Sequence, residues 1–81
     1  MRIDKYLKNS RIIKRRTVAK IACESGRVKV NSQIAKAGTE VNIGDIVEVS
    51  FGDKVIKVKV LELIENTNKA NAENMFKLIE E

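Results

Sequence analysis

The sequence predicts an α+β fold, in which two N-terminal helices pack on a small antiparallel β-sheet and a short C-terminal helix follows. Three observations predict it. The apolar residues are spaced at close to 3.6 positions up to residue 26, and at two positions from Arg27 onward. Single glycines stand between the predicted helices and strands, where turns are expected, and the chain has no proline. With 81 residues, of which 43% are hydrophobic, the chain can bury one modest core and forms a single domain.

The first helix is expected at the N-terminus, where Ile3, Tyr6 and Leu7 recur at helical spacing among charged residues. Because Tyr6 shares this apolar side, we expect its ring in the core rather than stacked on a nucleobase. Ile12 and Ile13 are expected to be buried in the connector that follows. A second helix is expected to end at Gly26, a typical C-terminal glycine. Its apolar stripe is predicted to consist of Val18, Ile21, Ala22 and Ser25.

The sheet is expected to begin at residues 27–30, where polar and apolar side chains alternate. Asn31 and Ser32 then form a turn into a short return strand at residues 33–34. Gly44 and Asp45 turn the chain into the next strand. A hairpin at Gly52 leads to the last predicted strand, in which Ile56, Val58 and Val60 alternate with Lys57 and Lys59. Both lysines are expected to face outward.

The C-terminal part is expected to be a polar linker followed by a short helix. Residues 66–71 are polar except for Ala70, and Asn71 is a suitable N-cap. Met75, Phe76 and Ile79 follow at amphipathic spacing. The sequence therefore predicts a helical basic part over residues 1–26, a sheet over residues 27–65 and a linker with its helix over residues 66–81.

Charge is unevenly distributed along the chain. Residues 1–30 contain ten Lys or Arg against two acids, a net charge of +8, whereas residues 31–81 contain six bases and nine acids, a net charge of −3. This separation is typical of a protein that docks one face on a polyanion. Two explanations of Asp4, within the basic part, are equally open. It pairs with a neighbouring base, or it favours the first turn of its helix.

The composition argues against catalysis. The chain has no histidine, and its one cysteine, Cys23, lies beside the apolar stripe of the second helix, where a buried structural thiol is favoured over a nucleophile. The glycines stand singly, so no phosphate-binding glycine loop is expected. We therefore expect no catalytic residue, metal ion or cofactor. No stretch approaches the roughly 20 apolar residues of a membrane span, and a cytoplasmic location is expected.

Binding of structured RNA is the function that these observations favour. Two adjacent basic helices can contact several phosphates, and the N–H groups at the start of the second helix add partial positive charge. Nothing in the sequence indicates a dimer-forming segment or a long basic arm, which favours RNA over paired DNA half-sites.

Three motifs resemble the S-four RNA-binding domain family, also called the alpha-L RNA-binding motif. They are R-x-D-K-x-L at residues 2–7, R-T-x-A at residues 16–19 and G-x-V-x-V-N at residues 26–31. The resemblance covers residues 1 to about 50, and it extends over essentially the whole chain for the stand-alone RqcP-like subgroup, to which heat-shock protein 15 is related. Ser32 replaces the glycine that is usual in the family's hairpin, so a less tight turn is expected.

The resemblance implies an RNA-binding role for the first 65 residues. The residues matching Arg2 and Arg16 are those most tied to RNA contact in the family. The full set of candidate RNA-binding residues is Arg2, Asp4, Lys5, Lys8, Arg11, Lys14, Arg15, Arg16, Thr17, Lys20, Arg27 and Lys29.

The resemblance also implies partners. The RqcP-like subgroup binds the large ribosomal subunit that carries peptidyl-tRNA, contacts large-subunit rRNA and the tRNA, and works with an RqcH-type factor that adds a C-terminal alanine tail to the stalled chain. It implies a non-enzymatic protein that is a monomer off the ribosome. Three alternatives stay open: a general RNA chaperone or ribosome-assembly factor, a rescue factor like heat-shock protein 15, and a protein-interaction module that docks through its C-terminal helix.

Overall fold

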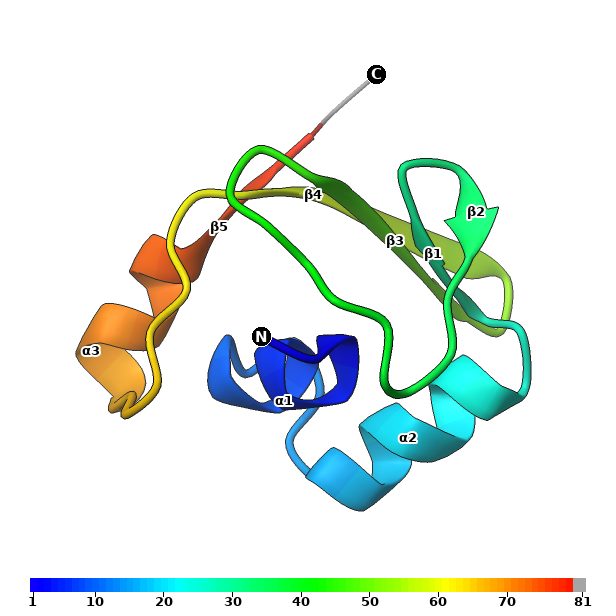
Figure 1. The fold of residues 1–81 in the computed structure, drawn as a ribbon, viewed down its shortest axis with the longest axis horizontal. Coiled ribbons are helices and arrows are strands. Elements are labelled where there is room, and N and C mark those ends of the chain that lie inside the picture. The colour runs from blue at the N-terminus through cyan, green and yellow to red at the C-terminus, as the bar shows by residue number, and fades with distance from the viewer. Residues whose placement is uncertain (80–81) are drawn as a thin grey trace.

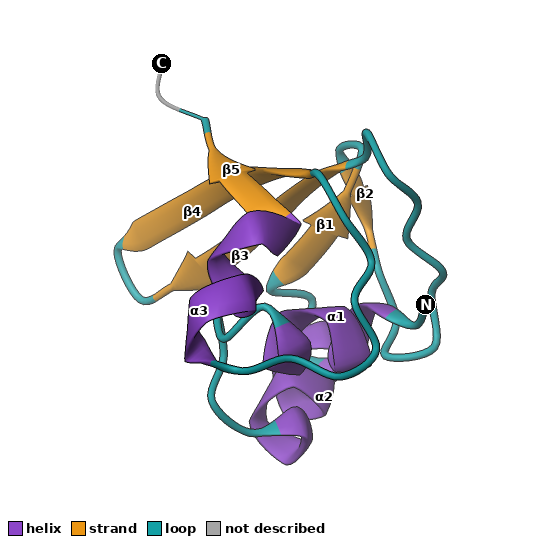
Figure 2. Ribbon diagram, turned by 90° about the vertical axis from the view of Figure 1, so that its left-hand side faces the viewer, coloured by secondary structure: helices purple, strands orange, loops and turns teal. Residues whose placement is uncertain are grey.

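The computed structural model describes residues 1–79 as two layers, with the helices on one side of an antiparallel sheet (Figures 1 and 2). The helices are α1 (Ile3–Asn9), α2 (Arg16–Glu24) and α3 (Lys69–Ala72), and the 3-10 turn η1 (Glu73–Met75) follows α3. The strands are β1 (Val28–Val30), β2 (Gln33–Ile34), β3 (Ile46–Phe51), β4 (Lys54–Val60) and β5 (Phe76–Leu78), in the order β2-β1-β3-β4-β5. No helix in residues 1–79 has the length and apolar character needed to cross a membrane.

The core lies between the two layers. On the sheet side it consists of alternate residues of three strands: Val28, Val30, Val47, Val49, Val58 and Val60. On the helix side, Ile3, Tyr6 and Leu7 are fully buried, as the spacing predicts. Since side chains alternate along a strand, the residues between these valines lie on the opposite face. There Glu48 pairs in register with Lys29 and with Lys57.

The buried stripe of α2 differs from the predicted one. Ala19, Ala22 and Cys23 are buried, whereas Val18 is 48% exposed and Ile21 is 63% exposed. Both sets of residues have helical spacing, so periodicity alone does not choose between them. The structure buries the smaller side chains because they let α2 pack closely against α1, and this turns Val18 and Ile21 toward solvent.

The C-terminal helix is earlier and shorter than predicted. Asn68, and not Asn71, is its N-cap: the side-chain oxygen of Asn68 accepts from the Asn71 N–H at 2.9 Å, and the Asn71 side chain accepts from the Asn68 N–H at 2.7 Å. The helix covers only four residues. Phe76 belongs to β5, which pairs with β4 and so covers an edge that would otherwise be exposed. The sheet therefore continues past residue 65, and residues 80–81 of the predicted helix lie outside the described residues.

The turn between β1 and β2 is tight, contrary to expectation. Val30 pairs directly with Gln33, and both intervening residues have positive φ, 51° at Asn31 and 70° at Ser32. Two such residues form the hairpin turn that matches the twist of the flanking strands. Ser32 therefore takes the backbone conformation that glycine would take, with the strain of a side chain in the left-handed region.

Candidate nucleic-acid interface

The backbone around Arg2 is fixed by the loop that precedes β3. The Ile3 N–H donates to the Thr39 carbonyl at 2.7 Å, and the Val41 N–H donates to the Met1 carbonyl at 2.9 Å. The N-terminal ammonium lies 2.8 Å from a carboxylate oxygen of Glu40. The backbone of Arg2 is therefore fixed at the start of α1, and its side chain extends from a fixed position.

Asp4 joins two arginines from different helices. Its carboxylate lies 3.3 Å from Nε of Arg2 and 3.4 Å from Nε of Arg16. The Asp4 side chain is only 3% exposed, whereas those of Arg2 and Arg16 are 49% and 47% exposed. Asp4 also stands in the first turn of α1, where it accepts from the Lys5 N–H at 2.8 Å. Asp4 therefore pairs with neighbouring bases, which is one of the two explanations that the sequence left open. Each guanidinium has five N–H donors, so both arginines keep donors that can bind a ligand.

Arg2 and Arg16 line a shallow hollow of about 300 Å³ together with Asp4, Thr17 and Lys20. The hollow lies at the start of α2, whose N-cap residue, Arg15, makes no side-chain capping hydrogen bond. The first backbone N–H groups of a helix lack partners within it and carry partial positive charge. A phosphate at this place would meet guanidinium groups, an ammonium, a hydroxyl and backbone donors together.

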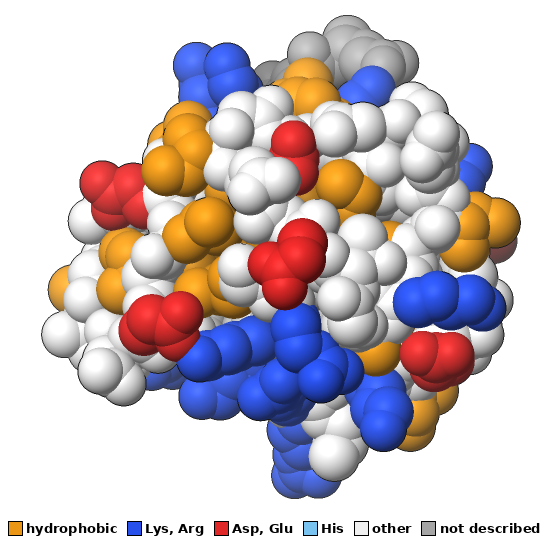
Figure 3. Space-filling view, viewed as in Figure 1, with side chains coloured by type: hydrophobic (Ala, Val, Ile, Leu, Met, Phe, Trp, Pro, Cys, Tyr) orange, Lys and Arg blue, Asp and Glu red, His pale blue; other side chains and the backbone are white. Residues whose placement is uncertain are grey.

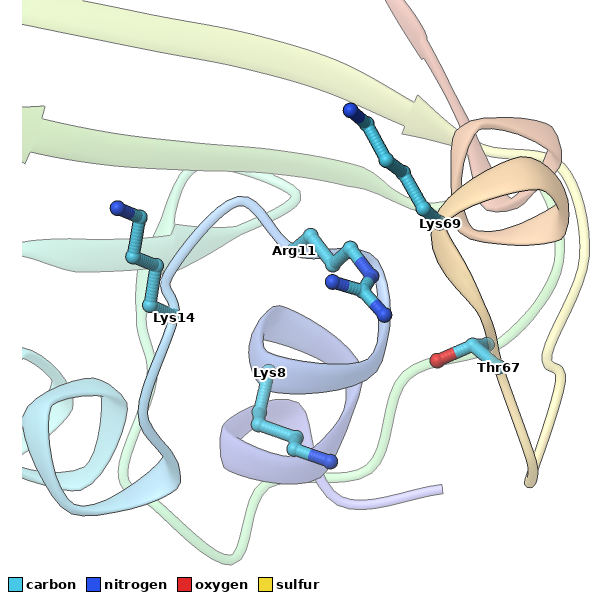
Figure 4. A pocket seen from close by; sticks show the side chains of 5 residues that line it. All are labelled: Lys8, Arg11, Lys14, Thr67 and Lys69. Atoms are coloured by element: carbon cyan, nitrogen blue, oxygen red, sulfur yellow. The ribbon is translucent and has the colours of Figure 1, made fainter.

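Lys8, Arg11 and Lys14 lie at the other end of α1. They line a second hollow of about 470 Å³ with two residues from the C-terminal part of the chain, Thr67 and Lys69. Figure 4 shows the five side chains, with Arg11 and Thr67 turned toward each other. Thr67 and Lys69 were not among the predicted site residues, because no local pattern connects them to α1.

Four of the predicted residues line neither hollow, and of these Arg15, the N-cap residue of α2, stands at the start of that helix. Lys5 is in an ion pair with Glu65, and the hydrogen bond and positive charge from Lys5 lower the pKa of that carboxyl. Arg27 follows Gly26, beyond the C-terminal end of α2. At 1.5 Å per residue the helix is about 14 Å long, so Arg27 lies at least that far from the start of α2 along the helix axis. Lys29 lies on the outer face of the sheet, on the side away from the helices. The structure thus does not bring Arg27 and Lys29 to either hollow.

Seven of the predicted cations, Arg15 included, form one basic surface over α1 and the start of α2. Figure 3, seen from the same side as Figure 1, shows Lys and Arg side chains gathered where Figure 1 places these helices. We call this the helical basic surface. Its members are Arg2, Lys8, Arg11, Lys14, Arg15, Arg16 and Lys20, all of them exposed.

Cys23 is fully buried in α2, as expected for a structural thiol. Burial raises its pKa to about 11, with smaller contributions from the charges of Asp4 and Glu24. The thiol is therefore protonated and shielded near neutral pH. Within residues 1–79, no three side chains of the metal-ligating types His, Cys, Asp and Glu come together.

Known proteins similar to this chain in sequence fall into one family. The S4 domain family matches residues 1–47. The chain is 53% identical to the RQC P-site tRNA stabilizing factor of Streptococcus pneumoniae, over all of this chain and 92% of that protein. It is 47% identical to the Bacillus subtilis protein of the same name, over all of this chain and 94% of that protein.

Similarity extends to heat shock protein 15. A homolog of that protein from Haemophilus influenzae is 35% identical over 63 residues, which cover 78% of this chain and 48% of the homolog. The trimeric structure of Vibrio cholerae heat shock protein 15 superposes with a TM-score of 0.90 at 26% identity, over 98% of this chain and 81% of that one. The chain therefore belongs to the S4 domain family and, within it, to the group of the RQC P-site tRNA stabilizing factors.

Proposed function

We propose that this protein binds the large ribosomal subunit during ribosome-associated quality control, where it contacts rRNA and stabilises a tRNA in the P site. The observation that carries the proposal is the pair of arginines, Arg2 and Arg16, held side by side by the buried carboxylate of Asp4. The names of the relatives in Streptococcus pneumoniae and Bacillus subtilis support the tRNA as a partner.

The physical basis of binding is phosphate recognition. An arginine presents five N–H donors in a planar fork that matches phosphate oxygens, and it stacks on bases where they are unpaired. If about five phosphates are neutralised, the affinity for RNA falls roughly 10²- to 10³-fold between 50 and 200 mM salt. The helical basic surface supplies enough cations for this number of contacts.

Within this function, the specific role proposed for the protein is to assist an RqcH-type factor in the cytoplasm. We infer that the protein, as a monomer off the ribosome, recognises a large subunit that still carries peptidyl-tRNA and holds the tRNA while the partner extends the stalled chain with alanine. In this proposal the protein supplies binding and positioning, and the partner and the ribosome supply the chemistry. The buried, protonated thiol of Cys23 fits a role without catalysis.

Sedimentation through sucrose gradients tests the proposal. In extracts with an induced translation stall, the protein is expected in the large-subunit fraction together with peptidyl-tRNA. The double substitution Arg2→Ala and Arg16→Ala is expected to move it to the top of the gradient. Lys59→Ala is a suitable control, since it removes one exposed lysine on the outer face of the sheet. A wild-type protein that stays at the top, or follows only intact ribosomes, would contradict the proposal.

A second candidate function is rescue of blocked large subunits in the manner of heat-shock protein 15, to which this chain is similar in sequence and in fold. Both functions place the protein on the same subunit, so sedimentation does not separate them. The two functions are instead distinguished by whether stalled chains carry alanine tails. Loss of tails in cells that lack this protein supports the first function, and unchanged tails support the second.

A further inference from the structure

A second group of cations lies at the C-terminal end of α1, separate from Arg2 and Arg16. It consists of Lys8, Arg11, Lys14 and Lys69, which line the hollow of about 470 Å³ (Figure 4). All four side chains are exposed, and within residues 1–79 none of them is in an ion pair. In Figure 4 the amino groups of Lys14 and Lys69 point away from the Arg11 guanidinium, as expected for like charges that repel one another. The hollow therefore gathers positive charge that the described part of the chain leaves uncompensated.

The backbone at Arg11 favours a role for its side chain. Arg11 follows Ser10, the C-cap of α1, and has a φ of 65°. This position after a helix is usually glycine, because a side chain in the left-handed region is strained. Backbone strain of this kind is found at ligand-binding sites as well as in tight turns such as that at Ser32. Here the strained backbone places an exposed guanidinium in the hollow, turned toward Thr67.

The C-terminal part of the chain is fixed against this end of α1. The buried Asn9 side chain donates to the carbonyls of Ile64 and Glu65, both at 3.1 Å. The Thr67 hydroxyl donates to the Asn9 carbonyl at 2.8 Å. Lys69 follows two residues later, after the Asn68 N-cap. Lys69 is thus brought to α1 by an ordered segment, which lies beyond the residues that the S4 domain family matches.

We propose that this hollow binds a backbone phosphate of RNA, with Arg11 and Lys69 as its principal ligands. The inference rests on the proposed RNA-binding function. RNA is favoured over an acidic peptide because the two hollows follow each other along α1. Asp4 borders one hollow and Lys8 the other, and the four positions between them correspond to a rise of about 6 Å along the helix, slightly more than one turn. A polymer with regularly spaced phosphates can occupy both hollows at once.

Substitution of Arg11 by glycine gives a sharp test, because it separates stability from binding. Arg11→Gly is expected to raise Tm by about 2–6 °C, since it relieves the strained backbone. The same substitution is expected to weaken binding of a fluorescently labelled RNA stem-loop by roughly three- to tenfold, and to lower the slope of log affinity against log salt by about 0.7–0.9. Lys69→Ala is expected to weaken binding and lower the slope by the same amounts with little change in Tm.

Two controls accompany these variants. Ser32→Gly relieves the same kind of strained backbone in an uncharged turn, and Lys59→Ala removes a lysine from the opposite face of the sheet. Both are expected to leave RNA binding unchanged. If Arg16→Ala lowers the salt slope while Arg11→Gly and Lys69→Ala keep the wild-type slope, the proposal of a second phosphate site is wrong and the proposed function stands. If the wild-type protein shows no salt-dependent RNA binding, both are wrong.

Discussion

Arg16, at the start of α2, lies 3.4 Å from the carboxylate of Asp4 on α1. The same carboxylate contacts Arg2, so one buried acid sets the positions of two exposed cations from different parts of the chain. An acid among phosphate-binding residues lowers the net positive charge. Its presence is explained if the positions of the two guanidinium groups contribute more to RNA binding than one additional unit of charge.

Asp4→Asn is therefore expected to weaken RNA binding although it raises the net charge of the protein. The amide has almost the same shape but no charge, so both ion pairs are lost and the arginines become mobile. Because the arginines are half exposed, the loss of stability is expected to be small, about 1 kcal/mol. Fluorescence anisotropy with a labelled RNA stem-loop measures the affinity. Tighter binding by the variant would show that charge matters more than position.

Asn9→Ala is expected to loosen the C-terminal segment. The substitution leaves the carbonyls of Ile64 and Glu65 without their side-chain donor, at a cost of about 1–3 kcal/mol in the free energy of unfolding. Urea denaturation measures this cost. Asn66→Ala, at an exposed position in the same segment, is the matched control and is expected to have little effect. Equal stability of the two variants would show that the Asn9 hydrogen bonds do not hold the segment.

Tyr6→Phe is expected to lower the free energy of unfolding by about 1 kcal/mol near neutral pH. The substitution removes the buried hydrogen bond in which the Tyr6 hydroxyl donates to the Met75 carbonyl at 2.9 Å. This bond connects α1 to the turn before β5. Thermal denaturation of the variant and the wild-type protein measures the loss, and an unchanged Tm would contradict it.

Tyr6 also makes stability dependent on alkaline pH. Burial raises the pKa of its phenol, so the folded protein keeps a proton that the unfolded chain releases above about pH 10. The stability from this group is complete below that pH and is lost as the pH rises further. Tyr6 is the only tyrosine, so tyrosinate absorbance reports it directly. We expect the absorbance to rise together with unfolding. A rise at about pH 10 in protein that is still folded would contradict the burial of the hydroxyl.

Ser32→Gly is expected to stabilise the fold by about 0.5–1 kcal/mol, because glycine adopts the φ of 70° without strain. Asn31→Gly is a useful contrast. The Asn31 side chain accepts from the Ile46 N–H at 2.9 Å and donates to Asp45 at 3.2 Å, which links the turn to the start of β3. Its loss is expected to destabilise the protein. Chemical denaturation of both variants tests the turn, and destabilisation by Ser32→Gly would contradict its geometry.

Local patterns in the sequence predict much of this fold. The apolar side of α1, the glycine after α2 and the alternation in β1 and β4 are properties of neighbouring residues, and the structure confirms each of them. The buried side of α2 was not predictable in this way. Ala19 and Val18 both belong to stripes of helical spacing, and the choice depends on how closely α1 approaches.

Features that depend on long-range contacts were also missed. Phe76 has helical spacing with its neighbours, but pairing with Val60 of β4 makes it part of a strand. The grouping of Arg2 with Arg16 follows from the family motif, whereas Lys69 joins Arg11 only because Asn9 fixes the C-terminal segment. Lys29 has the charge of an RNA-binding residue, but strand alternation places it on the outer face of the sheet.

The salt dependence of RNA affinity in the double variant Arg2→Ala and Arg16→Ala tests the central claim most directly. With two phosphate contacts removed, the slope of log affinity against log salt is expected to fall by about 1.4–1.8 relative to the wild-type protein. Because both ion pairs to Asp4 are lost, Tm is expected to fall by about 4–8 °C, and binding is compared at a temperature where the variant is still folded. An affinity and slope equal to those of the wild-type protein would contradict the assignment of these arginines to phosphate binding.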